Sequence, residues 1–135
     1  MPSLQDRLIV TAISLNIAWG DVDENIFAAA AAIEALPDIP DVIVLPETFS
    51  TGYIADSEQI ARVAQDWHNS TSIGAITEWA RKYNAAICST LLIKDGDQIF
   101  NRAVFVEPSG EITYYDKRHL FALSKEAKYI AAGRR

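Results

Sequence analysis

The sequence predicts an α/β protein with one mixed sheet and helices on one face of that sheet. In the first half of the chain, strand-like apolar runs alternate with helix-like stretches, which is typical of parallel crossovers. From about residue 85 onward, strand-like runs are separated only by short turns, which is typical of an antiparallel meander. With 135 residues, half of them apolar and 22% charged, the chain is long enough for one domain with a real core but not for two.

The first predicted elements are a strand and a helix. Residues 8–19 are rich in β-branched residues and then alternate apolar with polar, which predicts a strand with one buried face. Asp21 or Asp23 is placed to cap a helix that runs to Leu36, where Pro37 stops it. The apolar stripe expected on this helix consists of Ile26, Phe27, Ala30, Ile33 and Leu36.

The next elements complete the crossover and add two helices. The short apolar run 42–45 predicts a strand that is buried on both faces. Ser57 is then expected to cap a helix through Trp67, and Ser70 to cap another through Tyr83. The side of the second helix predicted to be buried carries Ile73, Ile76, Trp79 and Ala80.

The second half is predicted to be a meander of three strands, at 85–94, 99–107 and 111–115. The dipeptide Asp95-Gly96 is a strong hairpin turn signal, and residues 108–110 make the second turn. A sheet with helices on one face only leaves its other face exposed unless more chain or a partner covers it.

Composition limits the classes of partner and the compartment. The net charge of −6 and the pI near 4.8 argue against nucleic acid or an anionic membrane surface as the main partner. No apolar stretch is long enough to span a bilayer, and the N-terminus lacks the shape of a signal peptide. The single cysteine, Cys88, allows no intrachain disulfide, so we expect a cytoplasmic protein. Neither a Cys/His spacing for a metal nor a glycine-rich phosphate loop is present, so no cofactor is predicted.

Glu47 follows the predicted buried strand at 42–45, with only Pro46 between them. A carboxylate at such a strand end is held rigidly and is partly desolvated, which suits a general base. The alternative is that Glu47 caps a turn and faces water. Tyr53, which closes the same loop, either lines a substrate pocket or packs beneath the loop.

Lys117 lies after another predicted strand end and is flanked by aromatic residues. In a pocket, an ammonium group at this place would stabilise developing negative charge. The alternative is that residues 116–118 form a solvated charged turn. The two histidines favour structural interpretations, with His68 at the surface near a helix end and His119 ordering the loop beside Lys117.

Three segments resemble signatures of the nitrilase superfamily of carbon–nitrogen hydrolases. They are Leu-Pro-Glu-Thr-Phe-Ser-Thr-Gly-Tyr at 45–53, Asn-Arg-Ala-Val-Phe-Val-Glu-Pro-Ser-Gly at 101–110, and Tyr-Asp-Lys-Arg-His-Leu-Phe at 115–121. The order and spacing of these segments match the family over essentially the whole chain, and their amino-acid sequences are most similar to the ω-amidase branch. The resemblance implies half of a four-layer αββα sandwich, with residues 1–135 as the N-terminal portion of the hydrolase domain. It also implies hydrolysis of the amide of a small 2-oxo acid such as 2-oxoglutaramate, and a homo-oligomer in the full-length form.

By the same resemblance, Glu47 is the general base, Lys117 holds the oxyanion, and Glu126 is a second, supporting glutamate. Glu126 has the alternative of being an exposed loop acid. The family's nucleophile is a cysteine well beyond Gly133, so the chain is expected to stop before it. Cys88 lies mid-strand in an apolar run, where burial would raise the pKa of its thiol, so we interpret it as a packing residue. We therefore expect no amidase activity from these 135 residues alone. The alternative function is a non-catalytic binding or assembly module that associates through the open sheet face.

Overall fold

The computed structural model describes residues 6–54, 56–121 and 126–134. It contains a single mixed sheet with the strand order β1-β2-β4-β5-β6, and β3 pairs with β4 beside this path. The strands are β1 (Val10–Ala12), β2 (Val42–Val44), β3 (Gln65–Asp66), β4 (Ala86–Asp95), β5 (Gln98–Val106) and β6 (Ile112–Asp116). The helices are α1 (Val22–Glu34), α2 (Ser57–Val63), α3 (Thr71–Tyr83) and α4 (Glu126–Tyr129).

The strand directions confirm a parallel crossover followed by a meander. β1, β2 and β4 pair in parallel, and β4, β5 and β6 pair antiparallel. Asp95 pairs with Gln98, so the hairpin between β4 and β5 turns through two residues, and the first of them, Gly96, has a φ of 63°. A left-handed conformation at that position favours glycine, which is why the Asp-Gly signal located the turn correctly.

One face of the sheet is covered by α1 and α3 and holds the main core. Ser70 caps α3 as predicted, because its side chain accepts a hydrogen bond from the backbone N–H of Ile73. The buried residues of this core include residues of both helices, of β2 and the position after it, of β4 and of β5: Ala29, Ile33, Ile43, Leu45, Ile76, Trp79, Ala80, Ile87, Leu91, Ile93, Val104 and Val106. Because successive side chains of a strand point to opposite faces of the sheet, the strand residues between these core positions lie on the other face.

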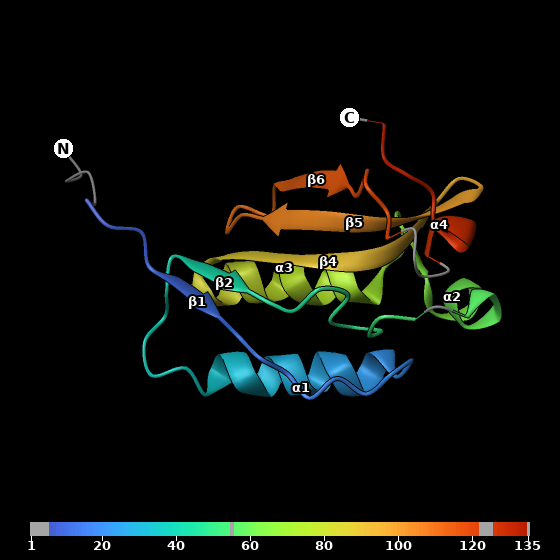
Figure 1. Ribbon diagram of the computed structural model, residues 1–135. Coiled ribbons are helices and arrows are strands. Elements are labelled where there is room, and N and C mark those ends of the chain that lie inside the picture. Colours follow the sequence, from blue (N-terminus) through green and yellow to red (C-terminus); the bar gives the residue numbers. More distant parts are fainter. Residues whose placement is uncertain (1–5, 55, 122–125, 135) are drawn as a thin grey trace.

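The other face, which we call the open face, is only partly covered (Figure 1). Val10, Phe105 and Tyr115 lie on it and are 52%, 37% and 48% exposed. At one end of the sheet, α2 and α4 bury a smaller cluster that consists of Ile54, Ile60, Val63, Leu92 and Ile130. The predicted placement of helices on one face is confirmed for α1 and α3, and the other face is left open except at the end covered by α2 and α4.

The predicted helix from Ser57 through Trp67 is wrong in its second half. α2 ends at Val63, and its cap is Asp56, whose side chain accepts from the N–H of Gln59. The chain then becomes extended as β3, and the N–H of Trp67 donates to the carbonyl of Lys94. Pairing with β4 satisfies backbone groups that a longer helix would have satisfied internally, and it brings Trp67 against the sheet.

Three smaller predictions also need correction. Of the predicted strand 8–19, only Val10–Ala12 forms β1. In β2, Ile43 is fully buried but its two neighbours are only half-buried, because they face the open side rather than a second layer. On α1, Phe27 is 69% exposed, and Asn25 is buried in its place.

Candidate active site

The loop that follows β2, residues 47–53, is held rigidly although it contains no regular structure. Its four central residues, 48–51, are each 2% exposed or less. Asn25 on α1 donates to the carbonyl of Ser50 at 2.9 Å, which explains why a polar side chain is buried on that helix. Phe49 is the apolar anchor, with its ring tilted against that of Trp79 at 6.3 Å between centroids.

Tight backbone geometry shapes the same loop. Thr48 adopts a left-handed φ of 46°, and its carbonyl accepts from the N–H groups of Thr51 and Gly52. Gly52 has a φ of 76°, and a Cβ there would lie 3.3 Å from the side chains of Ile17 and Trp19. A side chain at Gly52 would therefore be both strained and crowded.

Strand β4 fixes the point where the loop begins. Ser89 donates through Oγ to the carbonyl of Pro46 at 2.8 Å, and the N–H of Thr48 donates to Oγ1 of Thr90 at 2.7 Å. Glu47 lies between these two bonds, so its backbone is fixed on both sides. Its side chain nevertheless remains 54% exposed.

The structure brings Glu47 and Lys117 together. The distance from Lys117 Nζ to Glu47 Oε1 is 3.6 Å, and the lysine side chain is 34% exposed. The same Oε1 accepts a hydrogen bond of 2.8 Å from Nδ2 of Asn101 on β5. The ion pair is longer than a direct charge-assisted hydrogen bond, so the firmest recorded contact of this carboxylate is with the asparagine.

The backbone of Lys117 is held on both sides. Its N–H donates to the carbonyl of Asn101 at 2.9 Å, and its carbonyl accepts from the N–H of Gly133 at 3.0 Å. A Cβ at Gly133 would collide with the backbone oxygen of Asp116, so the segment at 131–134 approaches this strand end more closely than a side chain permits. Lys117 is thus clamped between β5 and the last described segment of the chain.

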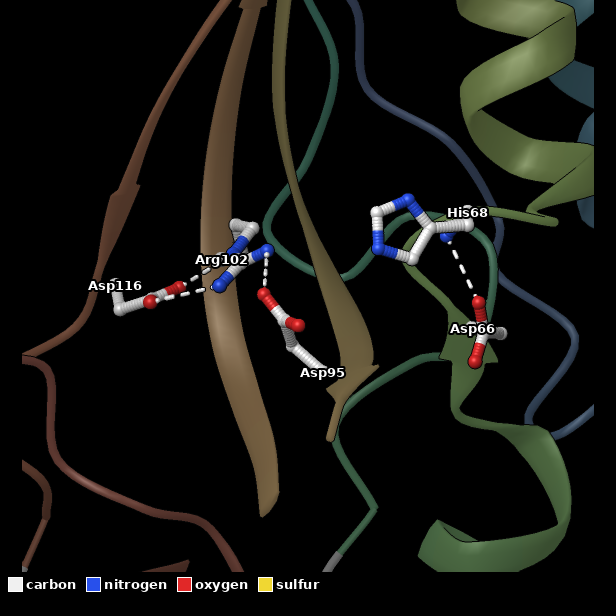
Figure 2. Close-up of polar contacts among 5 residues, drawn as sticks. All are labelled: Asp66, His68, Asp95, Arg102 and Asp116. Atoms are coloured by element: carbon white, nitrogen blue, oxygen red, sulfur yellow. Dashed lines mark hydrogen bonds and ion pairs between the residues drawn. The ribbon is translucent and has the colours of Figure 1, made fainter. Parts of the chain in front are cut away.

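A second charged cluster lies on the helix-covered face, centred on Arg102 (Figure 2). Its Nε and Nη2 donate to the two carboxylate oxygens of Asp116 at 2.7 and 2.9 Å, and Nη1 donates to Asp95 at 3.0 Å. The guanidinium carbon lies 4.4 Å from the ring centroid of Trp67 and 4.1 Å from that of Tyr114. Burial alone would lower the pKa of Arg102, but hydrogen bonding and attraction to the two aspartates outweigh it, so the pKa is raised.

Sequence reasoning missed this cluster, although a signal for it exists. In the hairpin register, Arg102 lies directly opposite Asp116, so an acid and a base face each other across β5 and β6. A cavity of about 540 Å³ borders the cluster and is lined by Arg102, Asp95, Asp116 and Tyr114 among others, but not by Glu47 or Lys117. Because the charged groups of the cluster already satisfy one another, we interpret the cluster as structural.

Two further residues, Tyr53 and Glu126, are also predicted to belong to the site. Tyr53 is 37% exposed, so it is not fully packed beneath its loop. Glu126 is the first residue of α4, but its side chain lies outside the described residues.

Cys88 lies near the start of β4 and is half-buried, and this burial raises the pKa of its thiol as predicted. His68 is at the surface, where its backbone N–H donates to Oδ1 of Asp66 (Figure 2). His119 is exposed in the loop after Lys117.

Two kinds of feature are absent from the described ranges, 6–54, 56–121 and 126–134. No three His, Cys, Asp or Glu side chains gather there in a way that would hold a metal ion. No helix within those ranges has the length and apolar character needed to cross a membrane.

The arrangement of Glu47 and Lys117 permits two chemical roles. A half-exposed carboxylate on a fixed backbone is accessible to a proton on a bound molecule, which general base catalysis requires. An ammonium group 3.6 Å away can stabilise negative charge that develops on the same molecule.

Comparison with known proteins places these features in a family. The family model described as carbon–nitrogen hydrolase matches residues 9–134. The chain is 31% identical over 133 residues to the omega-amidase YafV of Escherichia coli K12, covering 98% of this chain and 48% of that protein. It is 30% identical over 131 residues to the 2-oxoglutaramate amidase of Bacillus subtilis 168, covering 92% and 48%. The chain therefore spans about half the length of the curated relatives that it matches.

A solved structure supports the same conclusion. XC1258 from Xanthomonas campestris, described as a CN-hydrolase superfamily protein with an arsenic adduct in its active site, superposes with a TM-score of 0.87 at 32% identity. The match covers 95% of this chain and 47% of that structure, which is consistent with half of the αββα sandwich. By sequence and by structure, this chain belongs to the carbon–nitrogen hydrolase family.

Proposed function

We propose that this chain supplies the base and the oxyanion-binding cation of an amidase that acts on a small 2-oxo acid such as 2-oxoglutaramate. The observation that carries the proposal is the meeting of Glu47 and Lys117, which lie 70 positions apart in sequence, at 3.6 Å. The choice of substrate is supported by the relatives described as omega-amidase and 2-oxoglutaramate amidase.

In the proposed mechanism, a cysteine thiol attacks the amide carbonyl while Glu47 accepts the thiol proton. The carbonyl oxygen becomes negatively charged in the tetrahedral intermediate, and the Lys117 ammonium stabilises it. Glu47 then returns the proton to the departing nitrogen, which leaves as ammonia. Water, deprotonated by Glu47, hydrolyses the acyl-enzyme. Glu126 would support this set as a second glutamate, and Tyr53 would contact the substrate.

The nucleophile in this mechanism is not Cys88. The raised pKa of its thiol leaves less thiolate at neutral pH, and Cys88 lies within β4 rather than in a turn after a strand. We therefore propose that residues 1–135 are the N-terminal portion of a hydrolase domain, and that the reactive thiol is supplied from outside them.

Three experiments test this proposal. The 135-residue chain incubated with 2-oxoglutaramate should release no ammonia above background; turnover that disappears in Cys88→Ser would contradict it. Reading the coding sequence downstream of Arg135 should show an in-frame continuation with a cysteine at a strand end. In a polypeptide that includes such a continuation, Glu47→Gln should lower kcat by about 10²–10⁴-fold, whereas Glu58→Gln, an exposed control, should not.

The open face favours a second candidate function, that of a binding or assembly module. Val10, Phe105 and Tyr115 expose large apolar side chains on one side of the sheet. In this alternative, the chain associates through that face and catalyses nothing. Size-exclusion chromatography with light scattering distinguishes the two, because a monomer that binds no ligand would contradict the module.

Two further proposals concern the working state of the protein. We propose that the full-length form is a homo-oligomer, which light scattering on that form would test. We also propose a cytoplasmic location, because the single cysteine suits a reducing compartment, and cell fractionation would test it.

A further inference from the structure

Asn101 is the residue that contacts both members of the Glu47–Lys117 pair. Its side-chain Nδ2 donates to Glu47 Oε1 at 2.8 Å, and its backbone carbonyl accepts from the N–H of Lys117 at 2.9 Å. We propose that Asn101 is a positioning residue, which fixes the Glu47 carboxylate beside the Lys117 ammonium. This inference rests on the proposed function for its purpose, but its test does not depend on catalysis.

The position of Asn101 in the sheet makes its donor rigid. The residue lies within β5, which is hydrogen-bonded on both sides, and it is only 3% exposed. Glu47, in contrast, is 54% exposed on a flexible side chain. Because a rigid donor selects one orientation of a mobile acceptor, the hydrogen bond restricts where the carboxylate lies.

The residue after Asn101 prevents this donor from shifting along the strand. Arg102 points to the opposite face of the sheet, where it bonds both oxygens of Asp116 and one oxygen of Asp95. Asp116 directly precedes Lys117, so the ion pair fixes the strand end that carries the lysine. Asn101 and Arg102 therefore act from opposite faces of β5. Asn101 fixes the position of the Glu47 carboxylate, and Arg102 fixes the strand end that carries Lys117.

The hydrogen bonds of the Asn101 side chain suit a role in positioning Glu47 better than a role in stabilising the fold. Within the described residues, its Oδ1 is buried without a hydrogen-bond partner. An unsatisfied buried acceptor costs free energy, which offsets part of what the bond to Glu47 contributes. Asn101→Leu, which keeps a similar volume and removes both polar groups, should for this reason still fold.

Zero-length crosslinking measures the proposed role directly. A carbodiimide activates the Glu47 carboxylate, and the Lys117 amine displaces the activating group as a urea, so an amide bond joins the two side chains. Mass spectrometry of the digested 135-residue chain then gives the yield of the Glu47–Lys117 crosslink. Since the acceptor is half-exposed, loss of a hydrogen bond of ordinary strength should lower the initial rate about threefold or more in Asn101→Leu.

The matched control is Asn69→Leu, which changes an exposed asparagine in the turn before α3 and should leave the rate unchanged. Circular dichroism should show the same fold in both variants. An unchanged rate in Asn101→Leu, or no Glu47–Lys117 crosslink in the unaltered chain, would overturn the proposal. If the crosslinking pattern is as expected but a longer polypeptide that includes a downstream cysteine does not hydrolyse 2-oxoglutaramate, the proposed function alone would be overturned.

A second measurement decides the matter if Asn101→Leu does not fold. In Glu47→Met, the side-chain amide of Asn101 loses its acceptor, and its Nδ2 hydrogens should exchange with solvent about threefold faster or more, as observed by NMR. The control Glu58→Met should leave that exchange unchanged. Equal exchange rates with and without the Glu47 carboxylate would show that the bond does not form in solution, and the proposal would fall.

Discussion

The two charged clusters, one on each side of β5, differ in every physical property that matters for their roles. Around Arg102, which is 2% exposed, three hydrogen bonds of 2.7–3.0 Å join one cation to two carboxylates, and aromatic rings enclose the guanidinium. Around Glu47, the cation lies 3.6 Å away and both charged side chains remain partly exposed. The first cluster has little capacity left for a ligand, whereas the second has both charge and access.

This difference indicates that the Arg102 cluster serves stability, whereas the Glu47–Lys117 pair is not needed for that task. A buried ion network is costly to break, because removing one member leaves the others desolvated and unpaired. An exposed pair contributes little to folding, so its members are available for another purpose. The following predictions test the contrast, beginning with the largest expected effect.

Arg102→Ala should be the most damaging of these substitutions. It leaves the carboxylates of Asp116 and Asp95 without their cation and should lower the free energy of unfolding by about 3–5 kcal/mol. Urea denaturation gives this value, with the exposed Arg62→Ala expected to stay within about 0.5 kcal/mol of the unaltered chain. A loss below about 1 kcal/mol in Arg102→Ala would remove the basis of the comparison.

Asp116 and Asp95 should contribute unequally to the free energy of unfolding. Asp116 accepts two hydrogen bonds from Arg102 and is 15% exposed, whereas Asp95 accepts one and is 37% exposed. Asp116→Asn should therefore cost about 2 kcal/mol and Asp95→Asn about 1 kcal/mol or less. Parallel urea titrations would measure both, and equal costs would mean that burial does not control the strength of these bonds.

Glu47→Gln and Lys117→Met should each change the free energy of unfolding by less than about 1 kcal/mol, because their pair is partly exposed and long. The same denaturation experiment checks them. A cost comparable to that of Arg102→Ala would indicate that the pair is a structural bridge, and it would weaken the proposed catalytic roles.

The substitution Cys88→Ser should have the smallest effect on the free energy of unfolding, and that effect should depend on pH. Because burial raises the pKa of the Cys88 thiol, the folded state favours the protonated form. The resulting stabilisation is present below the ordinary thiol pKa of 9.0 and is lost as the pH rises through the folded value. The difference in unfolding free energy between the unaltered chain and Cys88→Ser should accordingly be constant from pH 7 to about pH 8 and then decrease in alkaline solution. A difference that increases above pH 9 would have the wrong sign.

The elements with strong local signals could be predicted from the sequence. Ser70 and the apolar spacing of Ile76, Trp79 and Ala80 located α3, and Asp95-Gly96 located the hairpin. Glu47 and Lys117 are candidates because each lies shortly after a strand, and the resemblance to the family strengthens that identification.

Features that depend on partners distant in sequence could not be predicted in the same way. The segment after Val63 leaves its helix because β4 offers it backbone partners, and nothing local to the segment indicates this. Asn101 and Arg102 are two consecutive polar residues inside an otherwise mostly apolar strand, and that local pattern does not indicate which residues they contact. Their contacts follow from the register of β5 with β6, which places Arg102 opposite Asp116 and the Lys117 backbone beside Asn101.

The open face has an electrostatic consequence for the Glu47–Lys117 pair. Asn101 points to the same side of the sheet as Leu92, opposite to α1 and α3, so Glu47 and Lys117 meet at the margin of that uncovered side. Any apolar layer laid over it would displace water and lower the local permittivity, and the attraction between the two charges would increase several-fold. Covering this surface would thus tune the acid and the amine without touching either.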